Sequence, residues 1–426
     1  MLRRVLLAVT AVAALFSFAS AEINFDSPKK FSLKESISGT SVENPVPGAA
    51  GDTSAAGAKE WTIMVFVNGK NNLERFLVSD MNEMEQIGST DKVNVVVEAG
   101  RTGSYSSSNS WKGTRRYLMQ KDADTATITS PVVQDLGKTD MGDYKSAIAF
   151  GKWAKENYPA RKYMLIIWNH GSGWVKAMGS KGISYDDETG NHINTPQMGE
   201  ILKAIGGVDV YGSDACLMQM AEVDYEIMGN TPYIVGSEET EPGDGYTYNL
   251  FLGPLAANPS MAPMEVARLA MNGYSDHYDS AGGGYTQSVV KTDALPGFMT
   301  AVDAFTDVVI KANERALVQK ARDSAQKYAY AENKDLYHFV QLLLASTKSE
   351  EVKAKGKELM DYITSTLVIG NRFGPGYSNS HGIAVYMPTA ALPAAYGELA
   401  WAKASKWADF IKWTQQRDAD EVPALN

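Results

Sequence analysis

The sequence predicts an α/β fold: a mostly parallel sheet with helices on both faces, followed by a mainly helical C-terminal subdomain. Two observations lead to this prediction. Short apolar runs alternate with helical stretches up to about residue 292, and helical patterns then continue to about residue 369. Each run is apolar throughout instead of at every second residue, which is typical of strands buried on both faces. The 426 residues are enough for two or three folding units.

The first 21 residues have the order of a secretory signal peptide. Two arginines at 3–4 precede an apolar stretch at 5–18, and small residues at 19–21 precede Glu22. The apolar stretch is too short for a transmembrane anchor. We therefore expect a secreted protein without a membrane anchor.

Residues 22–59 are expected to form a flexible linker or a short pro-segment. They are rich in Gly, Ala, Ser, Thr and Pro and contain too few large apolar residues to pack. At Trp61 the character changes, and WTIMVFVNG predicts a strand that ends at Asn68-Gly69. The folded part should therefore begin near residue 60.

Helices and strands then alternate along the chain. We expect helices around 73–86, 141–158, 195–205 and 218–228, and strands at 61–69, 93–97, 163–168, 208–212 and 233–236. Strands separated by helices form parallel sheets, because each helix returns the chain to the edge where the next strand begins. Residues 60–292 should form this sheet domain, and residues 293–426 a mainly helical subdomain with one late strand at 382–387.

The charge of the chain excludes one class of partner. The net charge is −10, and no run of Lys or Arg is present. Nucleic acid is therefore not expected as a partner, because binding to phosphates needs a basic patch. An acidic chain suits a basic substrate better.

Two strand ends carry the residues best suited to catalysis. His170 follows the strand at 163–168, and Cys216, the only cysteine, follows the strand at 208–212. In an open parallel sheet, functional groups gather at the carboxyl ends of strands, so the imidazole and the thiol should meet if these strands are neighbours. A nearby imidazolium and the N-terminus of the following helix would lower the pKa of the thiol. Taken singly, His170 could be a packed residue or a metal ligand, and Cys216 a buried small hydrophobe.

Gly171 fits the same site, and other chemistries fit less well. Its N–H can approach a substrate closely and, with the N–H of Cys216, could form an oxyanion hole. No zinc ligand set can be named, because the five histidines are scattered. Ser172 lacks the G-x-S-x-G frame of serine hydrolases. A non-catalytic secreted binding protein is the remaining alternative, although it would have no chemical reason to keep both His170 and Cys216.

Five segments carry a resemblance to a known family. They are WTIMVFVNGKNNLE at 61–74, WKGTRRY at 111–117, NHGSGW at 169–174, DACLMQMAEVDYEI at 214–227 and SEETEPGDGY at 237–246. In this order they resemble the clostripain family of cysteine peptidases, which is related in fold to caspases, gingipains and legumains. The resemblance runs from about Trp61 to Trp413, with NSHGIAVYMP at 379–388, and implies a caspase-like fold for residues 60–292. Lys70 departs from the family, which tends to have an acidic or small residue there.

The resemblance implies roles by position. His170 matches the catalytic histidine, and Cys216 matches the nucleophile that forms an acyl-enzyme. Asp214 and Asp244 match two carboxylates of the S1 pocket, and family members are similar in cleaving after Arg, less often after Lys. Two carboxylates favour a guanidinium because they can hold it by charge-assisted hydrogen bonds. Without the resemblance, Asp214 would be interpreted as a turn or cap residue and Asp244 as part of an ordinary turn. No third residue that orients His170 is expected.

The resemblance also bears on maturation and cofactors. Family members are often cut between the two catalytic residues, so we expect a zymogen that cleaves itself after Lys181 or Lys176. No cofactor should be required, and calcium is the only candidate because some relatives need it. Asp186, Asp187 and Glu188 could bind it, although no EF-hand spacing is present and a solvated acidic loop is the other interpretation. We expect a monomer that acts on proteins or peptides.

Overall fold

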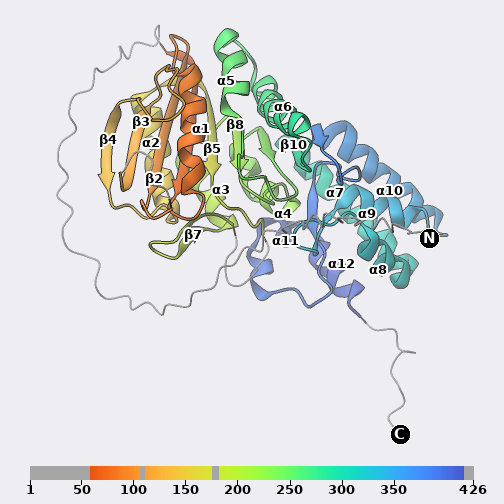
Figure 1. Cartoon of the computed structure of the whole chain (residues 1–426). Coiled ribbons are helices and arrows are strands. Elements are labelled where there is room, and N and C mark those ends of the chain that lie inside the picture. Colours follow the sequence, from red (N-terminus) through yellow and green to blue (C-terminus); the bar gives the residue numbers. More distant parts are fainter. Residues whose placement is uncertain (1–57, 106–110, 175–181, 417–426) are drawn as a thin grey trace, which may run out of the picture. The chain divides into compact units, whose positions relative to one another are not determined.

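The computed structural model describes residues 58–105, 111–174 and 182–416. The expected signal peptide and all but the last two residues of the expected linker lie outside these ranges, as do Lys176 and Lys181. Within the described residues, a nine-stranded sheet lies between two layers of helices (Figure 1). The predicted fold class is confirmed.

The sheet is mostly parallel. In spatial order its strands are β12 (Val368–Phe373), β10 (Thr286–Lys291), β9 (Tyr233–Gly236), β8 (Val210–Asp214), β5 (Ala160–Trp168), β1 (Lys59–Gly69), β2 (Val93–Arg101), β3 (Gly113–Leu118) and β4 (Val132–Gly137). The central strands from β9 to β2 pair parallel, whereas the strands beyond them at either edge pair antiparallel. Only β3 and β10 therefore run against the common direction, and the carboxyl ends of the other strands point down in Figure 1.

Helices cover both faces of this sheet. One face carries α1 (Glu74–Ile87), α5 (Tyr248–Ala257) and α6 (Pro263–Ala281), and the other carries α2 (Tyr144–Asn157), α3 (Thr195–Ala204) and α4 (Ala221–Ile227). The core on the second face continues into α7 (Leu295–Ala312), α8 (Arg315–Ser324), α9 (Leu336–Leu344), α10 (Glu350–Tyr362), α11 (Ala400–Ala404) and α12 (Trp407–Thr414). None of the helices in the described ranges is both long enough and apolar enough to cross a membrane.

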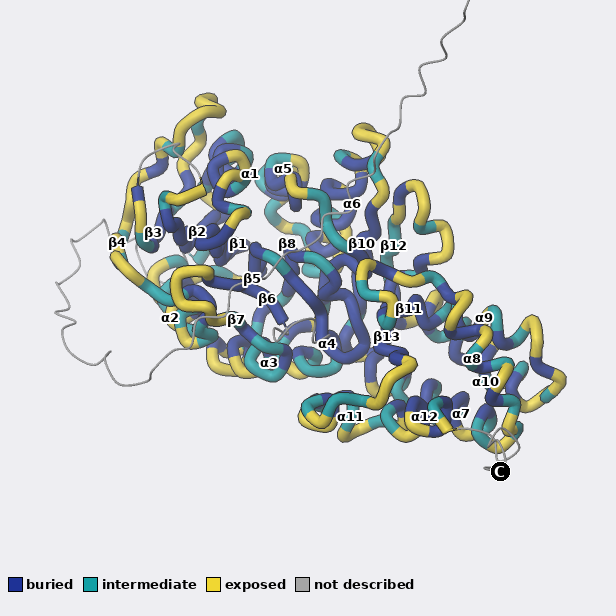
Figure 2. The backbone as a smooth tube through the Cα atoms, turned by 60° about the horizontal axis from the view of Figure 1, so that its bottom comes forward, coloured by how far each residue is buried: buried dark blue, intermediate teal, exposed yellow. Residues whose placement is uncertain are grey.

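The central strands are buried on both faces, as their apolar runs predict. In β1, Ile63 and Val65 pack in the core under α1, α5 and α6, whereas Met64 and Phe66 pack in the core of the other face. All four side chains are inaccessible to solvent. Figure 2 shows the contrast between the buried centre of the sheet and its exposed edge at β4. Removing such a side chain to Ala costs about 2–5 kcal/mol.

The C-terminal part contributes to the same sheet. β12 pairs antiparallel with β10, and β11 (Asn333–Asp335) pairs with β13 (Ala384–Tyr386) in a small separate sheet. β13 lies within the late strand expected at 382–387. β12 was not expected, and it brings a strand from beyond residue 292 into the main sheet. The division of the chain at residue 292 stays a prediction.

The predicted start of the helix at 218–228 is wrong. α4 begins only at Ala221, because Leu217 has a left-handed φ of 64° and Met220 is extended, with φ −132° and ψ 146°. Neither backbone conformation belongs to a right-handed helix. Cys216 therefore lies in a turn before the helix and not at its N-terminus.

Candidate active site

The two strand ends that carry His170 and Cys216 lie side by side. β5 and β8 pair in parallel, with Trp168 opposite Asp214, and the N–H of Asn169 donates to the carbonyl oxygen of Asp214 at 3.1 Å. His170 and Cys216 each come two residues after this matched pair. The register thus places the imidazole and the thiol at the same edge of the sheet, which is what a shared cleft requires.

Gly171 packs directly against the turn that carries Cys216. A Cβ atom on Gly171 would lie 2.2 Å from the carbonyl oxygen of Cys216, so any side chain would clash there. Gly171 forms a β-bridge with Ile183, which is the first residue of β6 (Ile183–Asp186). The bridge uses the N–H of Ser172 and the carbonyl of His170, and not the N–H of Gly171. The N–H of Gly171 therefore takes no part in this bridge. It lies at the position where an oxyanion donor is expected.

A third strand end holds His170. Its Nε2 lies 2.6 Å from Oδ1 of Asn72, in the loop that follows β1. Since an amide oxygen can only accept, Nε2 carries the proton of the neutral ring, and Nδ1 has the lone pair. Burial lowers the pKa of His170 to about 4, so the ring is neutral near pH 7. Asn72 was not foreseen from the sequence; the available signal was that β1 should neighbour β5 and end at the same edge.

Asparagines also join the strand ends to β6. Asn169 accepts from the N–H of Tyr185 at 2.7 Å and donates to the carbonyl of Asn68. Asn68 in turn donates to Oγ of Ser184 at 3.0 Å, and Asn71 donates to the carbonyl of Tyr185 at 2.7 Å. These bonds satisfy backbone groups at the point where the buried strands stop, and thereby fix the backbone on either side of His170.

The thiol of Cys216 is protonated at neutral pH. Burial raises its pKa to about 12, and the carboxyl group of Glu241 adds to the effect. The N–H of Glu241 donates to Sγ at 3.3 Å, which only partly offsets it. The expected lowering of the thiol pKa is therefore wrong for this state, because the helix begins too late to help and the neighbouring charges are negative.

Asp214 and Asp244 differ sharply in exposure. Asp214 is 4% exposed and accepts from the N–H of Tyr246 at 3.0 Å and the hydroxyl of Tyr248 at 2.7 Å. The side chain of Asp244 is 70% exposed, with Oδ2 4.0 Å from Nε2 of His277. A Cβ atom on Gly245, which follows Asp244, would lie 2.6 Å from Oδ1 of Asp214. The loop thus brings Asp244 past Asp214, one carboxylate inside and the other at the surface.

Comparison with known proteins identifies the family. A sequence model described as the Clostripain family matches residues 65–413. The chain belongs to this family. It is therefore a cysteine peptidase, as the resemblance of its five segments implied, and its substrates are proteins or peptides.

Relatives of known identity agree with this assignment. Clostripain from Hathewaya histolytica is 25% identical over 390 residues, which cover 77% of this chain and 74% of that protein. The structure of a secreted C11 cysteine protease from Bacteroides thetaiotaomicron, in complex with an irreversible peptide inhibitor, superposes with a TM-score of 0.65 at 22% identity, covering 82% of this chain and 99% of that one. An inactive zymogen C11 protease from Parabacteroides distasonis gives 0.59 at 19% identity, with 82% and 98% covered. Both structures share the fold.

Three further carboxyl groups surround Asp214 in this clostripain-family site. Glu241 is hydrogen-bonded to Asp214 through their side chains, Asp80 accepts from Nε1 of Trp168 at 2.5 Å, and Glu83 accepts from the N–H of Tyr248 at 2.8 Å. Burial raises the pKa of Asp214 to about 6 and that of Glu83 to about 7, and it raises those of Asp80 and Glu241 strongly. None of these acids pairs with a Lys or Arg of the described residues. Sequence patterns could not find them, because their meaning depends on burial.

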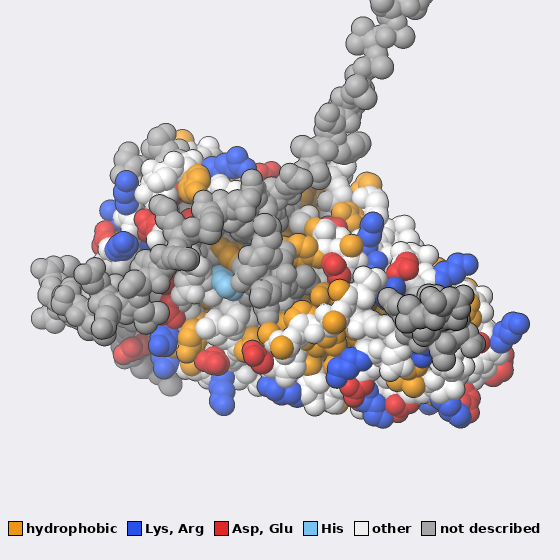
Figure 3. All heavy atoms as spheres, turned by 90° about the horizontal axis from the view of Figure 1, so that it is seen from below, with side chains coloured by type: hydrophobic (Ala, Val, Ile, Leu, Met, Phe, Trp, Pro, Cys, Tyr) orange, Lys and Arg blue, Asp and Glu red, His pale blue; other side chains and the backbone are white. Residues whose placement is uncertain are grey.

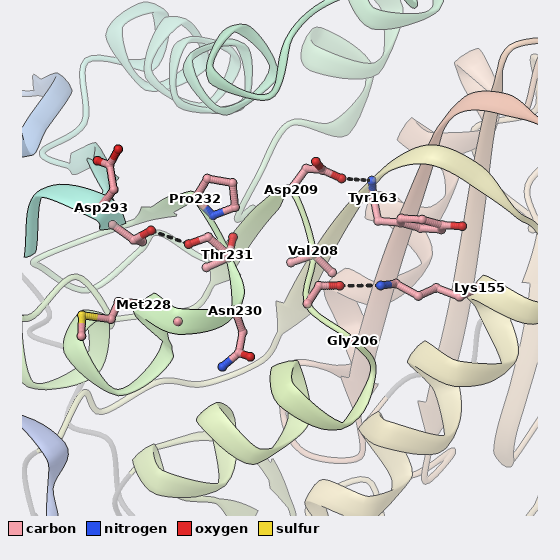
Figure 4. A pocket seen from close by; sticks show the side chains of 13 residues that line it. Lys155, Tyr163, Gly206, Val208, Asp209, Met228, Asn230, Thr231, Pro232 and Asp293 are labelled. Carbon is pink, nitrogen blue, oxygen red and sulfur yellow. Dashed lines mark hydrogen bonds between the residues drawn. The ribbon is translucent and has the colours of Figure 1, made fainter.

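A separate hollow of about 570 Å³ lies at the opposite end of the sheet (Figure 4). Its walls are the segments that precede β8 and β9, together with Lys155 near the end of α2 and Tyr163 in the first half of β5. Asp209 accepts from the N–H of Tyr163 at 2.7 Å, and Lys155 donates to the carbonyl of Gly207. The polar groups of the hollow thus bind one another, and it contains neither His170 nor Cys216.

Proposed function

We propose that the protein is a secreted endopeptidase that cleaves after Arg or Lys through a Cys216–His170 dyad. The observation that carries the proposal is the parallel register of β5 and β8, which places His170 and Cys216 at matched positions beyond adjacent strand ends. Asp214 closes β8 two residues before the nucleophile, where a carboxylate can meet the side chain on the acyl side of the cleaved bond.

The reaction follows from these positions. Sγ of Cys216 attacks the carbonyl carbon while the thiol proton passes to Nδ1 of His170. The N–H groups of Gly171 and Cys216 hold the oxyanion. His170 then protonates the leaving amine as the C–N bond breaks, which leaves a thioester on Cys216. Water attacks the thioester, gives a proton to His170 and releases the acid, and the thiol recovers its proton from His170.

The buried acids support a basic side chain at the cleaved position. Asp214 and Glu241 share a hydrogen bond, which requires one of them to be protonated. A cation brought against this pair would stabilise its ionised form. Asp244 at the rim offers a second carboxylate, and a planar guanidinium can bind two carboxylates in fixed geometry, which favours Arg over Lys.

Secretion and maturation belong to the same proposal. The order of charged, apolar and small residues at 1–21 supports export. Lys176 and Lys181 lie between the catalytic residues in sequence, and cleavage after either would suit an enzyme with this preference. We propose that the enzyme acts as a monomer and requires no cofactor. An uncut single chain with full activity would contradict the self-cleavage.

Peptides that differ only at the cleaved position test the specificity and the dyad together. Fluorogenic peptides with Arg, Lys or Gln there are assayed with wild type, Cys216→Ala and Asp214→Asn. We expect Arg above Lys and no cleavage after Gln. Asp214→Asn keeps an acceptor for Tyr246 but loses the charge, so kcat/KM for Arg should fall about 10–100-fold.

The controls separate the two parts of the proposal. Asp293→Asn changes an exposed carboxylate beside the distant hollow and should match wild type. Equal turnover by Cys216→Ala would overturn the mechanism. Equal rates on the Arg and Gln peptides would overturn the pocket assignment and leave the dyad standing.

A further inference from the structure

Lys70 is a completely buried cation next to the active site. It lies in the loop that follows β1, and its side chain has no solvent exposure. Nζ lies 3.1 Å from Oε2 of Glu188 and 3.8 Å from Oδ2 of Asp186, and it donates to the carbonyl oxygen of Thr139. A buried ammonium is costly unless oxygen atoms replace its water, and here two carboxylates and a carbonyl do so.

The acids around Lys70 are the residues from which the sequence suggested a calcium site, and they do not fit that ion. Oδ2 of Asp186 accepts from the N–H of Met141 at 3.0 Å, and its Oδ1 accepts from the N–H of Glu188 at 2.9 Å. Asp187 turns away and accepts from the hydroxyl of Tyr105 at 3.1 Å. Within the described ranges no three His, Cys, Asp or Glu side chains converge as metal ligands. Calcium takes six to eight oxygen ligands, whereas an ammonium needs about three, the number supplied to Lys70.

The backbone of Lys70 is tied to the same hairpin. Its carbonyl accepts from the N–H of Asp187 at 2.9 Å, and its own N–H donates to Oδ1 of Asn68 at 3.1 Å. β6 and β7 (Asn191–Ile193) form the hairpin that carries Asp186, Asp187 and Glu188 at its turn. Side chain and backbone of Lys70 therefore clamp the loop after β1 onto this hairpin.

This clamped loop carries the partner of His170. Asn72 comes two residues after Lys70, and its Oδ1 meets Nε2 of the imidazole at 2.6 Å. Asn71, between them, donates to the carbonyl of Tyr185 in β6. Displacement of the loop from the hairpin would thus move the group that holds the ring and its tautomer.

We propose that the Lys70 ammonium is a built-in cation that fixes the Asn72 loop on the β6–β7 hairpin and so positions His170 without a divalent metal ion. Lys70 is a positioning residue, and its effect on turnover rests on the dyad proposed above. The same acids would be left without a counter-charge if a small residue stood at position 70.

The test compares the response to calcium of wild type, Lys70→Met, Lys70→Ser and the control Lys152→Met, an exposed lysine on α2. Each protein is measured in EDTA and in millimolar calcium, for kcat and KM on the Arg peptide and for its melting temperature. Wild type and Lys152→Met should not respond. Lys70→Met should lose at least tenfold in kcat with KM changed less than threefold. Lys70→Ser should lose kcat in the same way, and calcium should not restore it, because the acids do not converge as metal ligands.

Asn72→Ala provides a second variant that leaves the Lys70 pocket intact. It should lower kcat about tenfold with a melting temperature close to that of wild type, which a purely structural role of the loop would not produce. Wild type that needs calcium for activity or for its melting temperature would overturn the proposal, as would Lys70→Met with wild-type kcat. If wild type cleaves no peptide, the proposed function fails, while the melting temperatures in EDTA and calcium still decide the role of Lys70.

Discussion

At the scale of single residues, the free enzyme holds a neutral thiol and a neutral imidazole. Burial raises the pKa of Cys216 to about 12 and lowers that of His170 to about 4, so neither is charged near pH 7. In the proposed mechanism the thiol therefore loses its proton as it attacks, not beforehand. The carboxyl groups of Glu241 and Glu239 disfavour the charged thiolate. A basic substrate side chain bound near them would reduce this electrostatic effect. Under the proposed preference for Arg or Lys, the substrate side chain would therefore contribute to reactivity as well as to binding.

Alkylation of the only cysteine measures this directly. At pH 7 the reaction of native Cys216 with iodoacetamide should be about 100–1000-fold slower than that of a free cysteine, because the thiolate fraction is reduced by the raised pKa. The rate should keep rising beyond pH 9. Mass spectrometry of quenched samples gives the rate, and the urea-unfolded chain, which should react like free cysteine, is the control. A rate that levels off below pH 8 would show that the thiol pKa is lowered instead.

At the scale of elements, the sequence predicts a strand best where the strand's own residues show that it is buried. β1 and β5 each contain an unbroken apolar run, at 63–67 and 163–168, where the strand is buried on both faces, and their positions follow from that run alone. β4 has exposed Val132 and Val133, and β12 is only partly buried, so neither shows such a run. These edge strands are defined by pairing with a neighbour, which is a property of the fold and not of the segment.

The active site divides in the same way. The placement of His170 and Cys216 at one edge could be predicted because each follows an apolar strand, and the order of the strands made these strands neighbours. Asn72 is 98 residues from His170 in sequence, and its role depends on the third strand end lying at the same edge. The late start of α4 depends on the backbone conformation at Leu217, which packing imposes on a residue that seldom adopts it.

Glu222 of α4 links the helix to the C-terminal part and should make stability fall with rising pH. Its Oε1 accepts from the N–H of Tyr386 at 3.0 Å and the hydroxyl of Tyr396 at 2.8 Å, and burial raises its pKa from 4.5 to about 7. The folded state therefore holds a proton that the unfolded state loses, so this contribution is full below pH 4.5 and is lost as pH rises through 7. The difference between these two pKa values corresponds to about 3 kcal/mol in the free energy of unfolding.

Glu222→Gln removes this titration while keeping an acceptor oxygen. Between pH 5 and pH 8 the free energy of unfolding of wild type should fall by about 1–3 kcal/mol more than that of the variant. Urea unfolding followed by circular dichroism at the two pH values measures the difference. Glu156→Gln, at an exposed position on α2, should behave like wild type. Parallel pH dependence of wild type and Glu222→Gln would show that the carboxyl group is ionised in the folded protein.

At the scale of the whole molecule, residues beyond 292 contact the segment that lies beside Cys216. Glu239, close to the thiol, accepts from the N–H of Ala329 at 2.9 Å and the hydroxyl of Tyr377 at 3.1 Å. Glu238 accepts from the N–H of Gly382 at 3.1 Å. Residues 238–239, which precede Glu241 beside the thiol, are therefore held by three contacts from residues beyond 292. Figure 3 views the molecule from below, the side toward which the carboxyl ends of the central strands point, and shows hydrophobic side chains gathered there.

The core makes the same connection. One continuous cluster of buried side chains joins Ile167 of β5 and Met218, two residues after Cys216, to Phe298 and Trp401 of the C-terminal helices. β12 also covers the outer edge of β10, which would otherwise expose unpaired backbone groups. A chain cut at the boundary predicted from the sequence would thus lose both core and sheet.

We therefore expect that residues 58–292 do not fold into an active peptidase alone. The fragment should be insoluble or lack the near-ultraviolet circular dichroism of the intact chain, because the buried surface of its cluster would face water. Co-expression with residues 293–416 should restore both the signal and cleavage of the Arg peptide, since the two pieces supply the complete core. Co-expression with a second fragment carrying Phe298→Asp, a charge placed in the shared cluster, is the control and should fail to rescue. A soluble 58–292 fragment with the activity of the intact chain would show instead that the C-terminal subdomain is dispensable, and that the shared core and β12 merely add stability to an independent domain.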